Sequence, residues 1–133
     1  FIFTGTCGRH NLQFWLVRTD ASGNLLWQTN YGGEAADRGR AIIQEDGGVC
    51  LLAGSSISRG TDSEDMWLLA IDRLGHLKWQ YTFGGQESDT FRAILKTSPG
   101  KCVLLGASDS YTGSWYDACL LGIDNRGRVL WGL

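Results

Sequence analysis

The chain has 133 residues, of which 43% are hydrophobic and 20% are charged, and it contains 19 glycines and six tryptophans. This composition is typical of a globular domain with a packed core and excludes an intrinsically disordered chain. The net charge of −2 argues against a general affinity for nucleic acid or for membrane surfaces. The sequence holds no apolar run near the roughly 18–20 residues of a membrane helix, so we expect no membrane insertion.

The chain opens on residues 1–5, which read as the middle of a β-strand, with no initiator methionine and no signal peptide before them. We therefore expect a processed or excised piece of something longer. The sequence then repeats itself every 52 residues. The matching positions are Trp15 and Trp67; Trp27, Trp79 and Trp131; Asp20, Asp72 and Asp124; Gly23, Gly75 and Gly127; Asp37 and Asp89; and Cys50 and Cys102. The one length change shortens the loop between Gly5 and Trp15, where insertions and deletions cost little.

One period predicts four short strands, at residues 40–44, 49–53, 65–72 and 77–83, separated by turns rich in glycine and aspartate. The third strand is apolar on both faces, as in a sheet that is covered on both sides. The fourth alternates between apolar and polar residues, as in a half-exposed strand near an outer edge. Short strands that recur at a fixed offset, with a buried third strand and a half-exposed fourth strand, indicate the stacked sheets of a β-propeller.

We therefore predict an all-β fold made of β-propeller blades, each a four-stranded antiparallel sheet, in a single repeat array. The predicted blades are residues 1–33, 34–85 and 86–133, and the first lacks its first strand, which gives about 2.75 blades. Because propellers usually close with roughly four to eight blades, we expect either further blades from a longer chain or association of several copies.

The repeated polar and aromatic residues allow a structural and a functional interpretation. Trp27, Trp79 and Trp131 could bind sugars, but a residue present in every repeat more often packs between the blades. Asp37 and Asp89 could line a site, although such an aspartate more often caps the backbone of the connection between blades. The aspartate of each Asp-x-x-Gly turn can accept hydrogen bonds from backbone N–H groups.

The order of these positions resembles a known repeat. The pattern is Gly-Gly-x-x-x-Asp, Ala-Ile, Asp-x-Trp-Leu and Asp-x-x-Gly-x-x-x-Trp-Gln, carried here by Gly32-Gly33 with Asp37, Ala41-Ile42, residues 65–68 and residues 72–80. It is similar to the propeller-type repeats of roughly 50 residues in secreted and cell-surface proteins of bacteria and archaea. The resemblance covers essentially the whole chain. It implies an extracellular, non-enzymatic protein with a structural or adhesion role, and it supplies no catalytic residue.

The third repeat departs from this pattern at two places. Cys119 stands in the register of Trp67. Gly132 stands in the register of Gln80. The Asp-x-x-Gly-x-x-x-Trp segment also resembles the tryptophan-docking motif of pyrroloquinoline-quinone-type propeller repeats, but those usually carry a Thr-Gly turn one residue longer. We interpret the segment as shared blade chemistry and expect no cofactor.

Specific recognition is expected where the repeats differ. The loop before the third strand of the third repeat is rich in aromatic residues, and we predict a binding surface made of Asp109, Tyr111, Trp115 and Tyr116. The acidic loop at residues 61–65 offers oxygen ligands for Ca²⁺. It lacks the spacing and the glycine of an EF-hand, which favours a solvated loop and no metal.

The four cysteines, Cys7, Cys50, Cys102 and Cys119, are too widely spaced for a zinc site. If the hairpin register is shared, Cys119 takes the place of Trp67 on the strand beside Cys102, and a Cys102–Cys119 disulfide can form. The alternative is four free thiols in buried or loop positions, since a small apolar cysteine suits a tight sheet.

No combination of nucleophile, base and acid is readable in the sequence, so we expect no enzyme. The predicted function is that of a non-enzymatic propeller repeat protein, acting as a structural, adhesion or assembly scaffold outside the cell or at its surface. One alternative is a propeller that recognises a glycan or peptide through the loops between second and third strands. A second alternative is part of a propeller enzyme with its active residues outside this chain. The expected partners are further copies or blades, or a glycan or protein ligand, and not nucleic acid.

Overall fold

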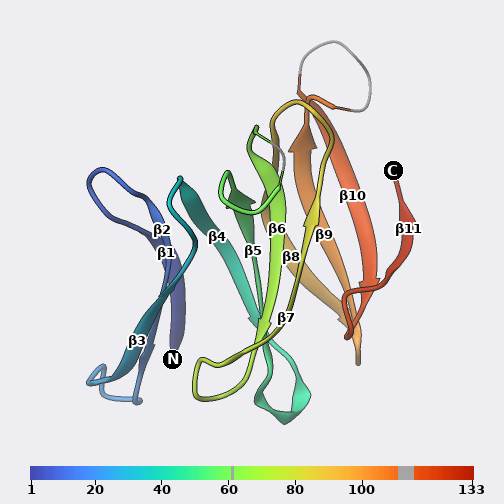
Figure 1. The fold of residues 1–133 in the computed structure, drawn as a ribbon. Helices are drawn as coiled ribbons and strands as arrows, with labels where there is room; N and C mark the ends of the chain where they lie inside the picture. Colours follow the sequence, from blue (N-terminus) through green and yellow to red (C-terminus); the bar gives the residue numbers. More distant parts are fainter. Residues whose placement is uncertain (61, 111–115) are drawn as a thin grey trace.

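The computed structural model describes residues 1–60, 62–110 and 116–133 and consists of three antiparallel sheets (Figure 1). The first sheet holds β1 (Ile2–Cys7), β2 (Gln13–Thr19) and β3 (Leu25–Tyr31). The second holds β4 (Asp37–Gln44), β5 (Cys50–Ser56), β6 (Asp65–Ile71) and β7 (Leu77–Phe83). The third holds β8 (Asp89–Ser98), β9 (Lys101–Ser108), β10 (Asp117–Asp124) and β11 (Val129–Gly132). A 3-10 turn, η1 (Asp46–Gly48), joins β4 to β5.

The all-β prediction is confirmed, and the sheets of three, four and four strands resemble propeller blades. The predicted strand at residues 77–83 coincides with β7. β4 begins at Asp37, earlier than the predicted residue 40, because its ladder with β5 continues to the pair of Asp37 with Ser56. Within the described part of the chain, no helix is long and apolar enough to cross a membrane.

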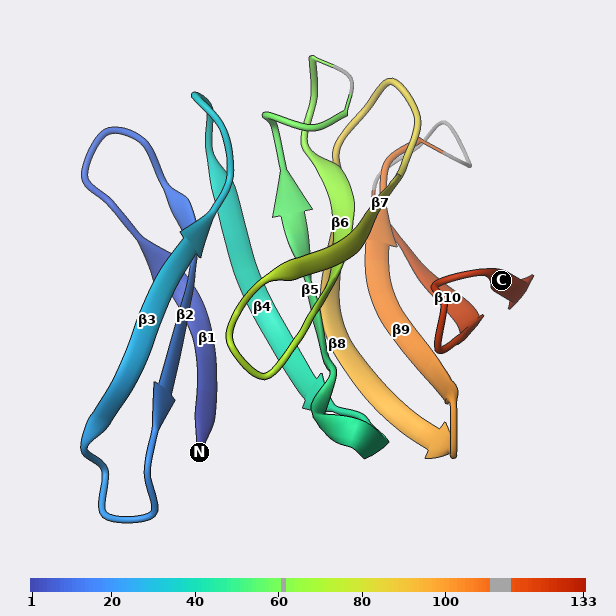
Figure 2. The ribbon, with the colours of Figure 1, turned by 60° about the horizontal axis from the view of Figure 1, so that its bottom comes forward.

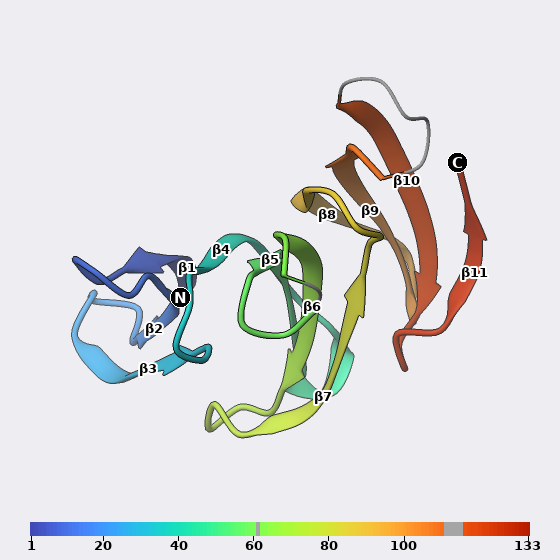
Figure 3. The same cartoon turned by 45° about the horizontal axis from the view of Figure 1, so that its top comes forward.

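The three blades stand side by side in chain order, with the second between the other two (Figures 2 and 3). β4 contacts β1 and β2 of the first blade and β8 of the third, so the interfaces between blades run along their inner strands. We call the face of a blade toward the preceding blade its leading face. We call the face toward the following blade its trailing face.

The second blade is buried on both faces, which explains why its third strand is apolar on both. Every residue of β5 and β6 is buried. On the leading face of the second blade, Trp67, Leu69 and Ile71 pack against Phe14 and Leu16 of the first blade. β7 lies at the outer edge and is partly exposed along its length, as its alternating sequence predicts.

A second cluster of apolar residues joins the second blade to the third. Met66, Leu68 and Ala70 alternate with the leading-face residues of β6 and therefore point to the trailing side. They pack with Phe91 and Leu104 of the third blade. The core is thus two layers between three sheets, which is why a single strand must be apolar on both faces.

Candidate functional site

A buried carboxylate stands at the start of the inner strand of the second blade. Asp37 is fully buried, and its Oδ2 accepts hydrogen bonds from the Gly33 backbone N–H at 2.8 Å and the Ser58 hydroxyl at 2.9 Å. The Ser56 hydroxyl donates to Oδ1. A Cβ atom at Gly32 would overlap the carboxylate, so only glycine lets the backbone pass this close. Asp37 therefore ties the connection between blades to the end of β5.

The third blade repeats this arrangement in the same register. Asp89 is fully buried and accepts hydrogen bonds from the Gly85 backbone N–H at 2.9 Å and the Ser110 hydroxyl at 2.7 Å. The Ser108 hydroxyl donates to its other oxygen. We call each aspartate with its glycine and two serines an aspartate node. The predicted capping of the connection is confirmed for Asp37 and Asp89, and a fully buried carboxylate has no surface for a dissolved ligand.

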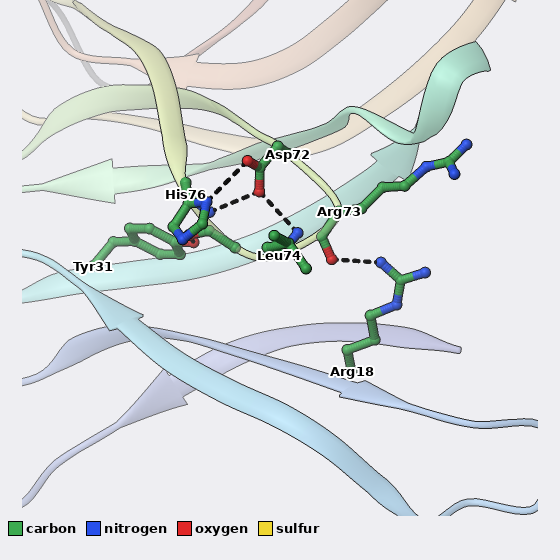
Figure 4. A network of polar contacts seen from close by, with 7 residues as sticks. Arg18, Tyr31, Asp72, Arg73, Leu74 and His76 are labelled. Atoms are coloured by element: carbon green, nitrogen blue, oxygen red, sulfur yellow. Dashed lines mark hydrogen bonds and ion pairs between the residues drawn. The ribbon is translucent and has the colours of Figure 1, made fainter.

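Each Asp-x-x-Gly turn is closed by its own aspartate. Asp72 Oδ1 accepts hydrogen bonds from the backbone N–H groups of Leu74 at 2.8 Å and His76 at 2.9 Å (Figure 4). His76 Nδ1 lies 3.0 Å from the other oxygen. These contacts, led by the backbone hydrogen bond from His76, hold the pKa of Asp72 below its ordinary value. At Asp20 the side-chain hydrogen bond from Asn24, followed by that from the Asn24 backbone N–H, lowers the pKa.

The first blade holds the turn of the second blade from the other side. Arg18 Nη1 donates a hydrogen bond to the Arg73 carbonyl at 2.7 Å (Figure 4). The Tyr31 hydroxyl donates to the Gly75 carbonyl at 2.5 Å. Burial, with a smaller contribution from Asp72, raises the pKa of Tyr31 to about 12. The hydroxyl therefore keeps its proton and remains a donor across the physiological pH range.

The repeated tryptophans of the outer strands pack on the turn of the next blade. A Cβ atom at Gly75 would lie 3.3 Å from the ring of Trp27. A Cβ atom at Gly127 would lie 2.8 Å from the ring of Trp79. The predicted packing between blades is confirmed for these two tryptophans. Trp131 lies on the trailing face of the third blade and is 46% exposed.

Another tryptophan in each of the first two blades is paired with a glutamine on the neighbouring strand. Trp15 Nε1 donates a hydrogen bond to Gln28 Oε1 at 3.2 Å. Trp67 Nε1 donates to Gln80 Oε1 at 3.1 Å. Trp67 is 1% exposed, and its ring meets that of Phe14 edge-on with 5.8 Å between centroids. The Trp67–Gln80 pair thus fills the leading side of the second blade.

The third blade replaces both members of this pair. Cys119 and Gly132 occupy the two positions, and a cavity of about 430 Å³ lies beside them, between the second and third blades. The corresponding space beside Trp67 and Gln80 is about 200 Å³. The residues around the larger cavity include Met66, Ser108, Asp117, Cys119, Leu121 and Gly132. Its wall is almost entirely apolar.

The strand register corrects the predicted pairing of Cys102 with Cys119. Cys119 lies opposite Gly106 and Cys102 lies opposite Ile123 on the β9–β10 ladder. The two cysteines are thus about 13 Å apart along the strands, which exceeds the reach of a disulfide. All four cysteines are free, as in the alternative interpretation. Burial raises the pKa of Cys119, and burial together with Glu45 raises that of Cys102 to about 12.

A polar cluster at the end of β4 also joins the second blade to the third. Glu45 is buried, and its Oε1 accepts a hydrogen bond from the Cys102 thiol at 3.1 Å. Lys96 Nζ lies 3.3 Å from Glu45 Oε2 and 3.1 Å from Asp46 Oδ1. These contacts, with that to Asp46 the largest, raise the pKa of Lys96. The cluster pins the inner strands at the end opposite to the aspartate nodes.

Two of the four residues predicted to bind a ligand, Tyr111 and Trp115, lie outside the described residues. Asp109 is half-buried, and its backbone N–H donates a hydrogen bond to the Ser88 carbonyl at 3.0 Å. Tyr116 is exposed next to the start of β10. The proposed surface therefore stays a prediction.

The acidic loop before β6 has its own structural contacts. Glu64 accepts hydrogen bonds from Arg38 Nη1 at 2.9 Å and from the Ser55 hydroxyl at 2.5 Å. Asp65 is buried, while Thr61 lies outside the described residues. Among the described residues, no group of three or more histidine, cysteine, aspartate or glutamate side chains could hold a metal ion.

Comparisons with known proteins assign no family. No protein-family model matches the chain, and no curated protein matches it. The repeat-like arrangement of three sheets is shown by the structure itself. The relation to one particular group of surface repeats is not.

Proposed function

We propose that this chain is a non-enzymatic propeller scaffold that assembles with further copies of itself through its two outer blade faces. One observation carries the proposal. The outer faces of the first and third blades correspond in register to the two sides of the interfaces that the chain forms between its own blades. The extracellular location and adhesion role implied by the repeat resemblance belong to the same proposal.

The trailing face of the third blade presents large apolar side chains to solvent. Leu105 and Trp131 are 42% and 46% exposed. Ala53 and Trp79 stand in the same register on the second blade, and both pack in the cluster between the second and third blades. The third blade therefore carries the trailing half of an interface.

The leading face of the first blade is its counterpart. Phe1 and Phe3 are 71% and 54% exposed. The ladders of β1 with β2 and of β5 with β6 place them in the register of Cys50 and Leu52. Cys50 and Leu52 are buried against the first blade. On the strands that it has, the first blade therefore carries leading-face apolar residues of the same kind of interface.

Two different faces that correspond to the two sides of one kind of interface favour head-to-tail association. The trailing face of one copy would cover the leading face of the next, and the contact would be repeated until a ring closes. Removal of the exposed leucine, phenylalanine and tryptophan side chains from water supplies the driving force.

Sedimentation equilibrium of the full chain tests this assembly. We expect oligomers for the unaltered chain and monomers for Phe3→Glu alone or Leu105→Glu alone, because each variant loses one half of the contact. An equimolar mixture of the two variants should give a heterodimer, because each retains the half that the other has lost. Leu74→Glu is the matched control, since Leu74 is an exposed leucine of a turn and should leave the oligomers intact. A monomeric unaltered chain, or a homodimer of Phe3→Glu, would contradict the proposal.

A further inference from the structure

We propose that the cavity beside Cys119 is a binding site for a small, uncharged, planar aromatic molecule of about the size of indole. The cavity lies between the second and third blades, whereas the proposed assembly uses the outer faces of the first and third. The two proposals can therefore fail independently.

The first argument is the side chain that is replaced. In the second blade the same position holds an indole ring, that of Trp67, buried against Phe14 of the preceding blade. In the third blade Cys119 faces Met66 of the preceding blade, with 3.9 Å between their sulfur atoms. Gly132 leaves out the glutamine side chain that would bond the indole N–H. Both partners of one hydrogen-bonded pair are therefore absent together, and the cavity lies beside the two positions that they would occupy.

The second argument is that two of the strands beside the cavity, β9 and β10, are held in place. β9 and β10 are paired without interruption from Ser108 with Asp117 to Lys101 with Asp124. Ser108 is also fixed by its hydrogen bond to the buried Asp89. A cavity persists where its surroundings are unable to relax into it. Its volume of about 430 Å³ is within the range of roughly 300–1,000 Å³ that is usual for small-molecule sites.

The third argument is the chemistry of the wall. The sulfur atoms of Met66 and Cys119 are soft and polarisable, and such atoms make favourable contacts with aromatic rings. Leu121 adds apolar surface. A charged ligand would lose its hydration against this wall, so the site favours a neutral ring.

Titration calorimetry with indole as the probe tests the site on the full chain. We expect saturable binding of one indole with a dissociation constant on the order of 1 mM, typical of a ligand this small. The double variant Cys119→Trp with Gly132→Gln rebuilds the pair and should weaken binding by about tenfold or more. Cys50→Ala removes a cysteine from the other interface and should bind indole as the unaltered chain does. Equal binding by the double variant, or no saturable binding by the unaltered chain, would overturn the proposal.

Alkylation of Cys119 gives a second measurement that needs no variant to fold. Iodoacetamide labelling is followed by mass spectrometry at pH about 9, because burial raises the pKa of this thiol. Saturating indole should slow labelling of Cys119 several-fold and leave the rates at Cys50 and Cys102 unchanged. Labelling of Cys119 at an unchanged rate would overturn the proposal. Indole-3-acetate should protect less, and equal protection by this anion would refute the preference for a neutral ring.

Discussion

The interface between the first and second blades and the interface between the second and third share their aspartate nodes and differ in their apolar filling. Asp37 and Asp89 hold the two connections with the same set of donors. Trp67 fills the first interface, whereas Cys119 lies beside a cavity in the second. An unpaired buried polar group costs a full desolvation penalty, while a cavity costs in proportion to its size. The repeat can therefore vary its filling more freely than its buried hydrogen bonds.

The largest expected effect is a difference in stability loss between truncating Trp67 and truncating Cys119. Trp67→Ala should lower the free energy of unfolding by about 3–5 kcal/mol, because it removes a large buried ring that packs on Phe14. Cys119→Ala in the same register should cost about 1 kcal/mol or less, since the thiol already borders empty space. Urea denaturation at constant m-value measures both. Similar losses at the two positions would remove the proposed contrast.

The aspartate nodes should instead behave alike. Asp37→Ala and Asp89→Ala each leave two hydroxyls and a backbone N–H without their acceptor, and we expect a loss of about 3 kcal/mol for either. Ser58→Ala removes a single donor and should cost about 1–2 kcal/mol as the graded control. The same denaturation experiment applies. Losses that differ by more than about 1 kcal/mol between the two aspartates would show that the nodes are unequal.

A smaller difference is expected at the ends of the outer strands. Tyr31 donates a hydrogen bond to the Gly75 carbonyl, whereas Phe83 stands in its register in the second blade and has no hydroxyl. Tyr31→Phe should therefore cost about 1 kcal/mol and make the first interface resemble the second. Tyr81→Phe changes an exposed tyrosine and should stay within about 0.5 kcal/mol of the unaltered chain. A larger loss for Tyr81→Phe than for Tyr31→Phe would contradict this assignment.

The smallest expected effect concerns acid. In the folded chain the pKa of Asp72 lies below its ordinary value of 3.8. Burial opposes the same change at Asp124, but the hydrogen bonds from Arg128 prevail and lower its pKa as well. Because the unfolded chain takes up these protons first, their contribution to stability is present above pH about 4 and is lost as the pH falls through the lowered pKa.

Asp72→Asn and Asp124→Asn should each flatten the fall in stability between about pH 5 and pH 2. Thermal unfolding followed by circular dichroism over this range checks both. We expect similar changes, because each turn has the same backbone geometry and each is packed by a tryptophan of the preceding blade. If either variant lost stability more steeply in acid than the unaltered chain does, the expected effect of these carboxylates would be wrong in sign.

Much of the fold can be predicted from the sequence, because the same pattern of strands and turns recurs in each repeat. The alternation in residues 77–83 predicts β7 to the residue, since one face of an edge strand remains wet. The apolar run at β6 predicts burial on both sides. Trp27 and Trp79 are correctly placed between blades by their recurrence alone.

The site was harder to predict for definite physical reasons. The periodicity places Cys102 and Cys119 on neighbouring strands, but antiparallel pairing puts them at different heights, and only the register shows it. The serines of the aspartate nodes escape prediction, because serine is common in loops, although Ser56 and Ser58 recur as Ser108 and Ser110. The cavity results from replacements on two different strands, Cys119 and Gly132. The sequence does not show that these replacements belong together, because the hydrogen bond between their counterparts Trp67 and Gln80 is seen only in the structure.

The packing of each outer-strand tryptophan on the following blade gives the array a direction. β3 and β7 are anchored by the turn that comes after them, whereas Trp131 of β11 is largely in solvent. Local opening should therefore start at β11, whose residues are all exposed, and amide exchange should be fastest there. A second copy bound over Trp131 would bury this ring and stabilise β11. Amide exchange in β11 should therefore slow as the outer face of the third blade becomes occupied, so that one measurement reports both the order of the strand and the binding of the copy.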